Sequence, residues 1–166
     1  MKLSGGVEWA LHCCVVLTAA SAPVPAARLA QLHDVSPSYL AKQMQALSRA
    51  GLVKSVQGKT GGYVLTRAAA EITVLDVVQA VDGASPAFVC TEIRQRGPLG
   101  TPPQDCAKPC PIARAMAAAD AAWRASLQEV SIADLVGSVE QDSGPRALPR
   151  IGAWLDPGND ADGSDR

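Results

Sequence analysis

The segment between residues 25 and 66 restricts the fold more than any other part of the chain. Residues 25–32 have the composition of a short helix, and after a brief turn Ser36 and Pro37 supply a helix N-cap and a first helical position. A second helix is predicted over residues 38–50. Two helices joined by so short a turn form a helix-turn-helix.

A β-hairpin is predicted directly after these two helices. Gly51 ends the second helix, residues 52–56 alternate as a strand does, residues 58–62 form a glycine-rich turn, and residues 63–66 make the return strand. A hairpin in this place is the wing of a winged helix. We therefore expect a mainly α fold with a small β-wing, in which residues 1–82 form a winged helix-turn-helix DNA-binding domain.

Further helices are expected on both sides of this unit. The first spans residues 5–20, and another amphipathic helix spans residues 73–81. A long Ala-rich helix over residues 111–129 carries only a thin apolar stripe, made of Ile112, Met116, Ala119, Trp123 and Leu127. So thin a stripe favours packing against a second copy. Residues 111–140, which include a shorter helix at 131–139, are therefore predicted to be the dimerisation helices of a homodimer.

The remaining segments are expected to lack regular structure. Residues 83–109 have no periodicity and contain five prolines. A loop of this length in a compact protein is usually functional or disordered, and its cysteines favour function, so residues 83–110 are predicted to be a cluster-binding loop. Residues 141–166 form a C-terminal extension, and the acidic part beyond Asp156 is expected to be disordered.

Charge and position indicate a DNA-binding surface. Residues 1–67 carry seven Lys and Arg against two acidic residues, although the whole chain has a net charge of −1. A basic segment suits phosphate contact, and the second helix of such a pair enters the major groove. The candidate DNA-binding residues are Arg28, Ser36, Ser38, Tyr39, Lys42, Gln43, Lys54, Gln57, Lys59 and Thr60. Gln43 is suited to a bidentate contact with adenine. A winged helix used for protein contacts is the alternative.

Composition limits the class of protein. The longest apolar run, residues 13–20, is far shorter than the ~20 residues that span a bilayer, and no signal peptide is recognisable. We expect a cytoplasmic protein without a membrane partner, in which the five cysteines are thiols rather than a disulfide framework. Cys13 and Cys14 lie in the apolar first helix and are expected in the core. No nucleophile–base motif is visible, so an enzyme is not expected.

The other three cysteines mark a candidate metal or iron–sulfur site. Fifteen residues separate Cys90 from Cys106, and three separate Cys106 from Cys110. The sequence has no CxxC pair, which disfavours structural zinc, whereas iron–sulfur clusters usually take four cysteines. Cys110 precedes Pro111 at the start of the long helix, where the helix dipole favours a thiolate.

Glu8 and His12 are further candidate ligands. They are four residues apart and therefore share one face of the first helix. A surface ion pair is the alternative interpretation of this spacing. Carboxylate and imidazole can both bind iron, however, and the loop is short of ligands.

These residues resemble those of the bacterial winged-helix, iron–sulfur transcription regulators that include IscR and NsrR. The matching motifs are MKLSGGVEWALHCC, SPSYLAKQMQALSRAGLVKSVQG, TGGYVLTR, ITVLDVVQAVDG and the cysteines before PIARA. The likeness covers roughly residues 1–140, and extends to about residue 155 for the redox-sensing, RsrR-type members. It implies a homodimer crossed through the long helix, with two clusters and a palindromic double-stranded DNA operator.

The resemblance also implies a ligand set. NsrR-like members use three loop cysteines and an acidic residue from the other subunit's first helix, a position held here by Glu8. Their loop has two equal gaps between cysteines, unlike this chain. The RsrR-type resemblance implies instead a [2Fe–2S] cluster bound by Cys90 and Cys110 of one chain and by Glu8 and His12 of the other. Cys106 is then a weaker candidate.

Three hypotheses for function follow. The first is a redox-sensing transcription regulator whose [2Fe–2S] cluster controls operator affinity. The second is a nitric-oxide or cluster-status sensor in which damage to the cluster, or its loss, is the signal. The third is a metal-free thiol switch that uses a Cys106–Cys110 disulfide.

Overall fold

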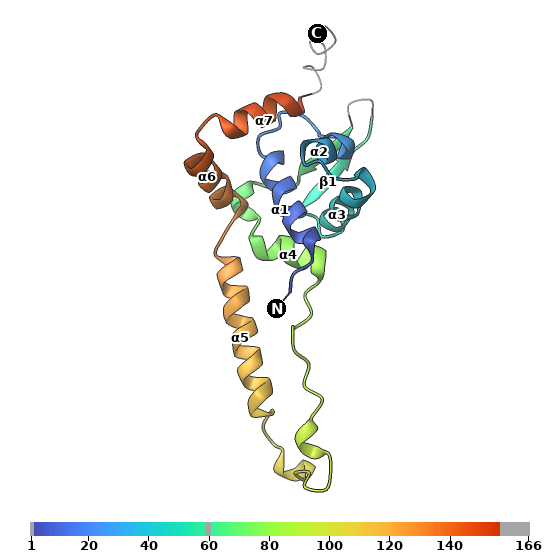
Figure 1. The fold of residues 1–166 in the computed structure, drawn as a ribbon, viewed down its shortest axis with the longest axis vertical. Helices are drawn as coiled ribbons and strands as arrows, with labels where there is room; N and C mark the ends of the chain where they lie inside the picture. The colour runs from blue at the N-terminus through green and yellow to red at the C-terminus, as the bar shows by residue number, and fades with distance from the viewer. Residues whose placement is uncertain (1, 59–60, 157–166) are drawn as a thin grey trace.

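A globular head and a projecting stalk make up the protein (Figure 1). The computed structural model describes residues 2–58 and 61–156. The elements in chain order are α1 (Gly5–Leu17), α2 (Ala26–Leu32), α3 (Pro37–Arg49), β1 (Val53–Val56), β2 (Gly62–Leu65), η1 (Ala69–Glu71), α4 (Val74–Asp82), η2 (Ile93–Gln95), η3 (Pro103–Asp105), α5 (Pro111–Gln128), α6 (Ile132–Ser143) and α7 (Ala147–Leu155). The mainly α fold with a β-wing is therefore confirmed.

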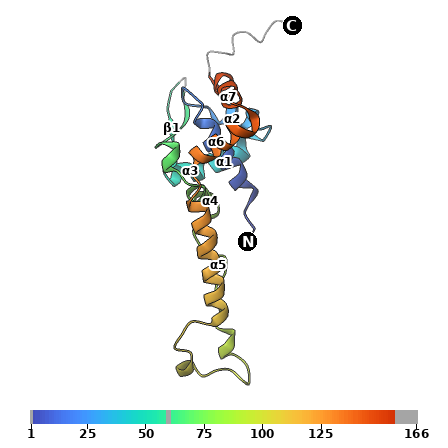
Figure 2. The ribbon, with the colours of Figure 1, turned by 90° about the vertical axis from the view of Figure 1, so that its left-hand side faces the viewer.

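The stalk consists of residues 83–130, and the remaining described residues form the head. In two perpendicular views, α5 and the loop that precedes it run side by side away from the head (Figures 1 and 2). No residue of α5 is buried in the described chain, and Ile112 is 65% exposed. None of the helices within the described ranges is long and apolar enough to cross a membrane.

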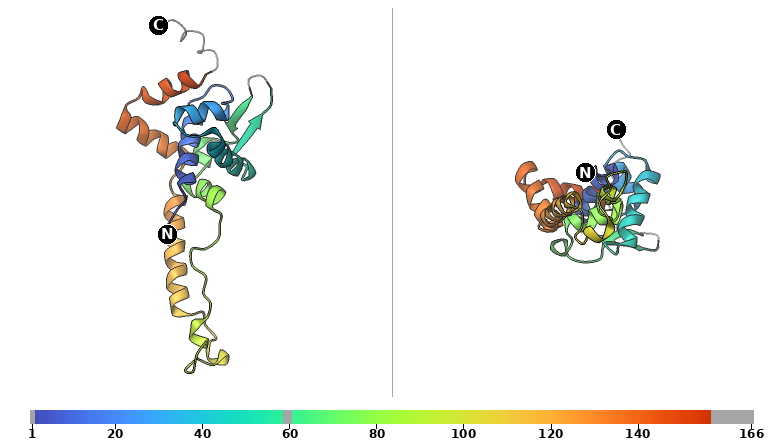
Figure 3. Two further views of the ribbon diagram at one scale, coloured as in Figure 1. Left: turned by 45° about the vertical axis from the view of Figure 1, so that its right-hand side comes forward. Right: turned by 90° about the horizontal axis from the view of Figure 1, so that it is seen from below.

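Helix α1 is the centre of the head. It packs against α3, α4, α6, α7 and β2, and Figure 3 shows α6 and α7 on one side of it and the hairpin on the other. Cys13 and Cys14 are fully buried in this core, as predicted, and burial raises the pKa of each thiol to about 12. The helix ends at Leu17, before the predicted residue 20, because the chain turns at Thr18, whose hydroxyl donates to the Val15 carbonyl at 2.6 Å.

Helices α2 and α3 form the predicted helix-turn-helix. The Ser36 hydroxyl accepts the Tyr39 N–H at 3.2 Å, so it caps α3 as expected. Gly51 has a φ of 72°, the left-handed conformation that ends helices at glycine. The fully buried side chains of Leu40, Met44 and Leu47 attach α3 to the core.

Strands β1 and β2 form the predicted wing. They are antiparallel, with Val53 opposite Leu65 and Val56 opposite Gly62. The chain before α2 extends this ladder, because Val24 and Tyr63 exchange two backbone hydrogen bonds of 3.0 and 2.8 Å. An added Cβ at Gly62 would overlap the Val24 backbone, so a glycine is required at this crossing.

The two ends of the stalk are joined at the head. The Val74 N–H donates to the Val130 carbonyl and the Ile132 N–H to the Ile72 carbonyl, each at 2.8 Å. Both flanking helices begin with a capping box, formed by Thr73 with Asp76 in α4 and by Ser131 with Asp134 in α6. This short bridge fixes where the stalk leaves the head and where it returns.

Helix α7 was not predicted. It contains Pro149 in its first turn, where a missing N–H costs little. Its buried residues Leu148, Gly152 and Leu155 pack it onto the head, with Gly152 against the Ala19 backbone. The predicted disorder beyond Asp156 falls on residues 157–166, outside those described.

Gly152→Ala is expected to destabilise the protein by about 1–3 kcal/mol, because the new methyl would overlap the Ala19 carbonyl oxygen. Gly137→Ala is the matched control, since a Cβ on that α6 residue meets nothing within 4 Å. The control is expected to be neutral or to stabilise by up to about 1 kcal/mol. Urea denaturation measures both, and an unchanged midpoint for Gly152→Ala would contradict the close packing of α7 on the α1–α2 connection.

Candidate metal centre and DNA-binding surface

Cys90 and Cys110 lie together on the stalk, away from the head. Cys90 is in the loop and Cys110 is the N-cap residue of α5, and both are half-buried. The Glu92 N–H donates to Cys90 Sγ at 3.4 Å. The pKa of Cys110 is lowered, first by the Ala113 and Ile112 N–H groups of the helix start and further by Arg94 and a hydrogen bond with Cys90. Two thiols are thus brought together where a thiolate is favoured.

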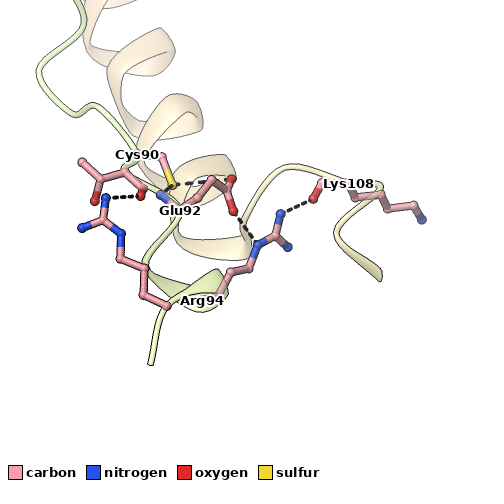
Figure 4. A network of polar contacts seen from close by, with 6 residues as sticks. Cys90, Glu92, Arg94 and Lys108 are labelled. Carbon is pink, nitrogen blue, oxygen red and sulfur yellow. Dashed lines mark hydrogen bonds and ion pairs between the residues drawn. The ribbon is translucent and has the colours of Figure 1, made fainter. Parts of the chain in front are cut away.

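A polar network adjoins Cys90 (Figure 4). Arg94 Nε contacts a Glu92 carboxylate oxygen at 2.7 Å, and a second guanidinium nitrogen donates to the Lys108 carbonyl, also at 2.7 Å. The pKa of Arg94 is raised, chiefly by its hydrogen bond to Glu92 and also by Cys106 and Cys110. Sequence analysis missed this network, although a Glu and an Arg two residues apart in a cysteine loop were a visible signal.

Cys106 is placed differently from the other two cysteines. It follows the short η3 helix, and its N–H donates to the Pro103 carbonyl at 3.0 Å. Its sulfur lies near enough to Arg94 to raise the pKa of that residue. Cys106 follows the end of η3, however, and is not at the start of a helix. It therefore lacks the N–H groups that favour a thiolate at Cys110.

Glu8 and His12 are exposed on the one open face of α1. With Leu11 and Val15 they form one wall of a groove of about 290 Å³. The other wall is formed by α6 residues: Leu135, Ser138, Val139 and Asp142. The predicted pair thus borders a mainly apolar groove that is open to solvent.

The two candidate ligand pairs do not meet within one protomer. α1 lies in the head, whereas Cys90 and Cys110 lie on the stalk (Figures 1 and 3). Across residues 2–58 and 61–156, no three His, Cys, Asp or Glu side chains of one chain gather into a metal-binding group. The structure thus brings together Cys90 with Cys110, and places Glu8 and His12 on one face, but does not join all four.

His33, in the turn between α2 and α3, lies beside this face of α1. Its ring is 5.6 Å from that of His12 and 5.9 Å from that of Trp9 between centroids. Its Nε2 is buried and has no hydrogen-bond partner among the described residues. Burial lowers the pKa of His33, and the neighbouring His12 lowers it further. The His33 ring therefore connects the Glu8/His12 face to the helix-turn-helix.

Most of the predicted DNA-contacting side chains that the structure describes are exposed. Ser36, Ser38, Tyr39 and Lys42 are exposed there, as are Lys54 and Gln57 of the hairpin segment. Lys59 and Thr60 lie outside the described residues. The Ser36 hydroxyl accepts the Tyr39 N–H and lies 3.5 Å from the Ser38 hydroxyl.

Two of the residues predicted to contact DNA instead make contacts within the protein. Gln43 is 5% exposed and packs against Gly6 of α1, so the predicted contact of its amide with adenine does not fit this structure. The physical reason is helical spacing, because position 43 falls on the buried face with Leu40, Met44 and Leu47. Arg28 lies 3.9 Å from the Trp154 ring centroid and donates to the Trp154 carbonyl at 2.6 Å.

Comparison with known proteins identifies the family. Residues 3–138 match Rrf2, described as an iron-dependent transcriptional regulator. The chain belongs to the Rrf2 family. The resemblance to IscR-type regulators is thereby confirmed, and this match covers α1 to α5 and the first part of α6 but not α7.

Individual relatives agree with this assignment. YwgB of Bacillus subtilis is 44% identical over 87 residues, which are 50% of this chain and 54% of that protein. IscR of Cronobacter sakazakii, an HTH-type transcriptional regulator, is 41% identical over 76 residues, 46% of this chain and 47% of that protein. The chain thus spans about half the length of these relatives.

A solved structure shows the same fold. CymR, the global cysteine regulator of Bacillus subtilis, superposes with a TM-score of 0.65 at 23% identity, over 83% of this chain and 98% of that one. The matched proteins with a stated role are transcription regulators and not enzymes. The likeness to CymR shows the fold, and the family assignment rests on the Rrf2 match.

In metal-free protein, Cys110 is expected to react with iodoacetamide more than about a hundredfold faster than Cys13 and Cys14 at pH 8. The lowered pKa of Cys110 gives it more thiolate at a given pH, whereas the pKa of about 12 leaves the core thiols protonated. Mass spectrometry of the alkylated peptides measures the rates, and protein unfolded in urea is the control. Similar rates for all three thiols in folded protein would contradict these environments.

Proposed function

We propose that this protein is a homodimeric transcription regulator whose affinity for a palindromic operator is set by the redox state of a [2Fe–2S] cluster. The observation that carries the proposal is the division of four donors into two pairs. Cys90 and Cys110 are together on the stalk, while Glu8 and His12 share the open face of α1 in the head. A second protomer whose stalk reaches this face would complete a set of four ligands.

The donors fit such a group. N–H groups directed at both sulfurs stabilise thiolates, which iron–sulfur clusters require. Glu8 and His12 are exposed, so a carboxylate and an imidazole are available without unfolding α1. When bound, the cluster would take up and release one electron. Cys90 and Cys110 would hold it from one protomer, and Glu8 and His12 from the other.

Contacts of α1 with α3 support coupling to DNA. Gly6 packs directly on Gln43, and the Tyr39 hydroxyl lies 3.6 Å from the position of a Cβ on Gly5. A shift of α1 therefore acts on the helix that carries the DNA-binding side chains. If the oxidised and reduced proteins favour different placements of the two heads, the difference in stability sets the difference in operator affinity.

Substitution of the ligands tests the cluster. In anaerobically purified protein, Cys90→Ala, Cys110→Ala and His12→Ala are each expected to lower iron and sulfide content or change the visible spectrum. Cys106→Ala is the matched control and is expected to keep the spectrum, the iron content and the redox response. A His12→Ala protein that is normal in all three respects would exclude His12 as a ligand. Glu8→Ala, alone and with His12→Ala, applies the same test to Glu8.

The nature of the signal needs a separate experiment. Operator binding is measured while the protein is titrated with dithionite and reoxidised, and then exposed to nitric oxide. A reversible response to reduction alone supports the redox proposal, whereas a response only to nitric oxide favours a sensor that acts by cluster damage. Colourless, iron-free protein after anaerobic purification would favour a metal-free thiol switch.

The DNA surface is tested by removing one charge at a time. Lys42→Ala is expected to weaken binding to all sequences and to reduce the slope of log affinity against log salt by about 1, because a phosphate contact is lost. Arg49→Ala removes the same charge from the opposite end of α3, where it is also exposed. Fluorescence anisotropy at several salt concentrations measures both. An equal effect of the two substitutions would contradict the placement of the N-terminal part of α3 on DNA.

A further inference from the structure

We infer that Arg94 is a positioning residue of the candidate cluster site, which ties the Cys90 and Cys110 segments together and places a fixed positive charge between them. The electrostatic half of this inference rests on the proposed function. The structural half concerns the loop itself and applies equally to metal-free protein.

One side chain joins the two ligand-bearing segments. Arg94 binds the Glu92 carboxylate, and the Glu92 N–H in turn donates to Cys90 Sγ. On the other side, Arg94 donates to the carbonyl of Lys108, two residues before Cys110 (Figure 4). The planar guanidinium can make both contacts at once because its donors diverge in a fixed fork, an arrangement that the single ammonium of lysine does not reproduce.

Apolar packing does little to hold this part of the loop. Its large apolar side chains are exposed, with Val89 at 74%, Ile93 at 73% and Leu99 at 96%. Burial of apolar surface therefore contributes little to its shape. Glu92 also adopts a left-handed φ of 52°, which is uncommon for a residue other than glycine. Such a conformation persists where surrounding contacts hold it, and here the Arg94 ion pair and the N–H to Cys90 do so.

The charge of Arg94 acts in a definite direction. A Glu92 carboxylate oxygen lies 3.8 Å from Cys90 Sγ, so one anion is already present beside the sulfur, and Arg94 offsets it. Uptake of one electron from a reductant such as dithionite adds a negative charge to the site. A fixed cation nearby favours this reduced form, so loss of that cation makes reduction harder.

The test compares three substitutions in otherwise complete protein. Arg94→Met removes the charge and the bridge but keeps an extended side chain. Arg94→Lys keeps the charge but loses the diverging N–H donors of the guanidinium. Arg96→Met is the matched control, because Arg96 lies in the same loop and its guanidinium donates to the Thr91 carbonyl at 3.0 Å instead of to Glu92 and Lys108.

The first measurement is a redox titration of the loaded protein. For Arg94→Met the ratio of reduced to oxidised protein at a fixed potential is expected to fall roughly tenfold, a shift of about 59 mV to more negative potential for one electron. Arg94→Lys is expected to recover most of this shift. A potential for Arg94→Met equal to that of Arg96→Met would overturn the electrostatic half of the inference.

The second measurement uses metal-free protein with Cys106 replaced by Ser. The rate at which diamide oxidises Cys90 and Cys110 to a disulfide reports how often the two sulfurs meet. This rate is expected to fall several-fold in both Arg94 variants and to remain unchanged in Arg96→Met. Equal rates in all variants would overturn the bridging role. A wild-type protein that never binds iron would refute the cluster proposal, whereas slow cross-linking of the Arg94 variants would still support the bridge.

Discussion

Burial of α1 on nearly every side is the constraint on which the rest of the structure depends. Five elements of the head pack against it, and its core residues include Ala10, Cys13 and Cys14. Only a narrow strip that contains Glu8 and His12 remains open to solvent. Because protein interiors are close-packed, α1 cannot shift without displacing its neighbours, and α3 is one of them. The same burial that stabilises the head thus connects any group bound at the open strip to α3, the candidate DNA-binding helix.

Local chemistry made much of the fold predictable. The Ser36-Pro37 start and the Gly51 end of α3 are set by capping and by glycine, and the hairpin follows from alternation, so these needed no knowledge of packing. Gln43 shows where such reasoning stops. A polar residue near the start of a recognition helix was assigned to DNA, although the spacing of its apolar neighbours already placed it on the buried face. Helix α7 was missed because Pro149 interrupts a short apolar run whose role depends on packing against the α1–α2 connection.

Local chemistry also made part of the candidate site predictable. A thiolate-favouring position for Cys110 followed from the proline after it, and the structure supplies the N–H groups that this position implies. The Arg94 bridge was not foreseen, since it depends on how residues far apart in the loop come together. Completion of the site by a second chain cannot be derived from one protomer by any local rule. That part of the prediction rested on family resemblance and stays a proposal; the stalk points away from the head that contains α1 (Figure 1).

The backbone β-bridge between Thr73 and Ser131, at the base of the stalk, affects how such regulators can diversify. A segment whose two ends are already clamped can gain or lose residues cheaply, since each doubling of a flexible loop adds only about 0.6 kcal/mol of closure entropy. Insertions within residues 83–110 would therefore leave the backbone pairing at the base of the stalk, and the packing of the head, unchanged. Unequal intervals such as the fifteen and three residues between these cysteines are what that freedom permits. Natural variation can thus change the cysteine spacing at the stalk while the fold of the head is inherited intact.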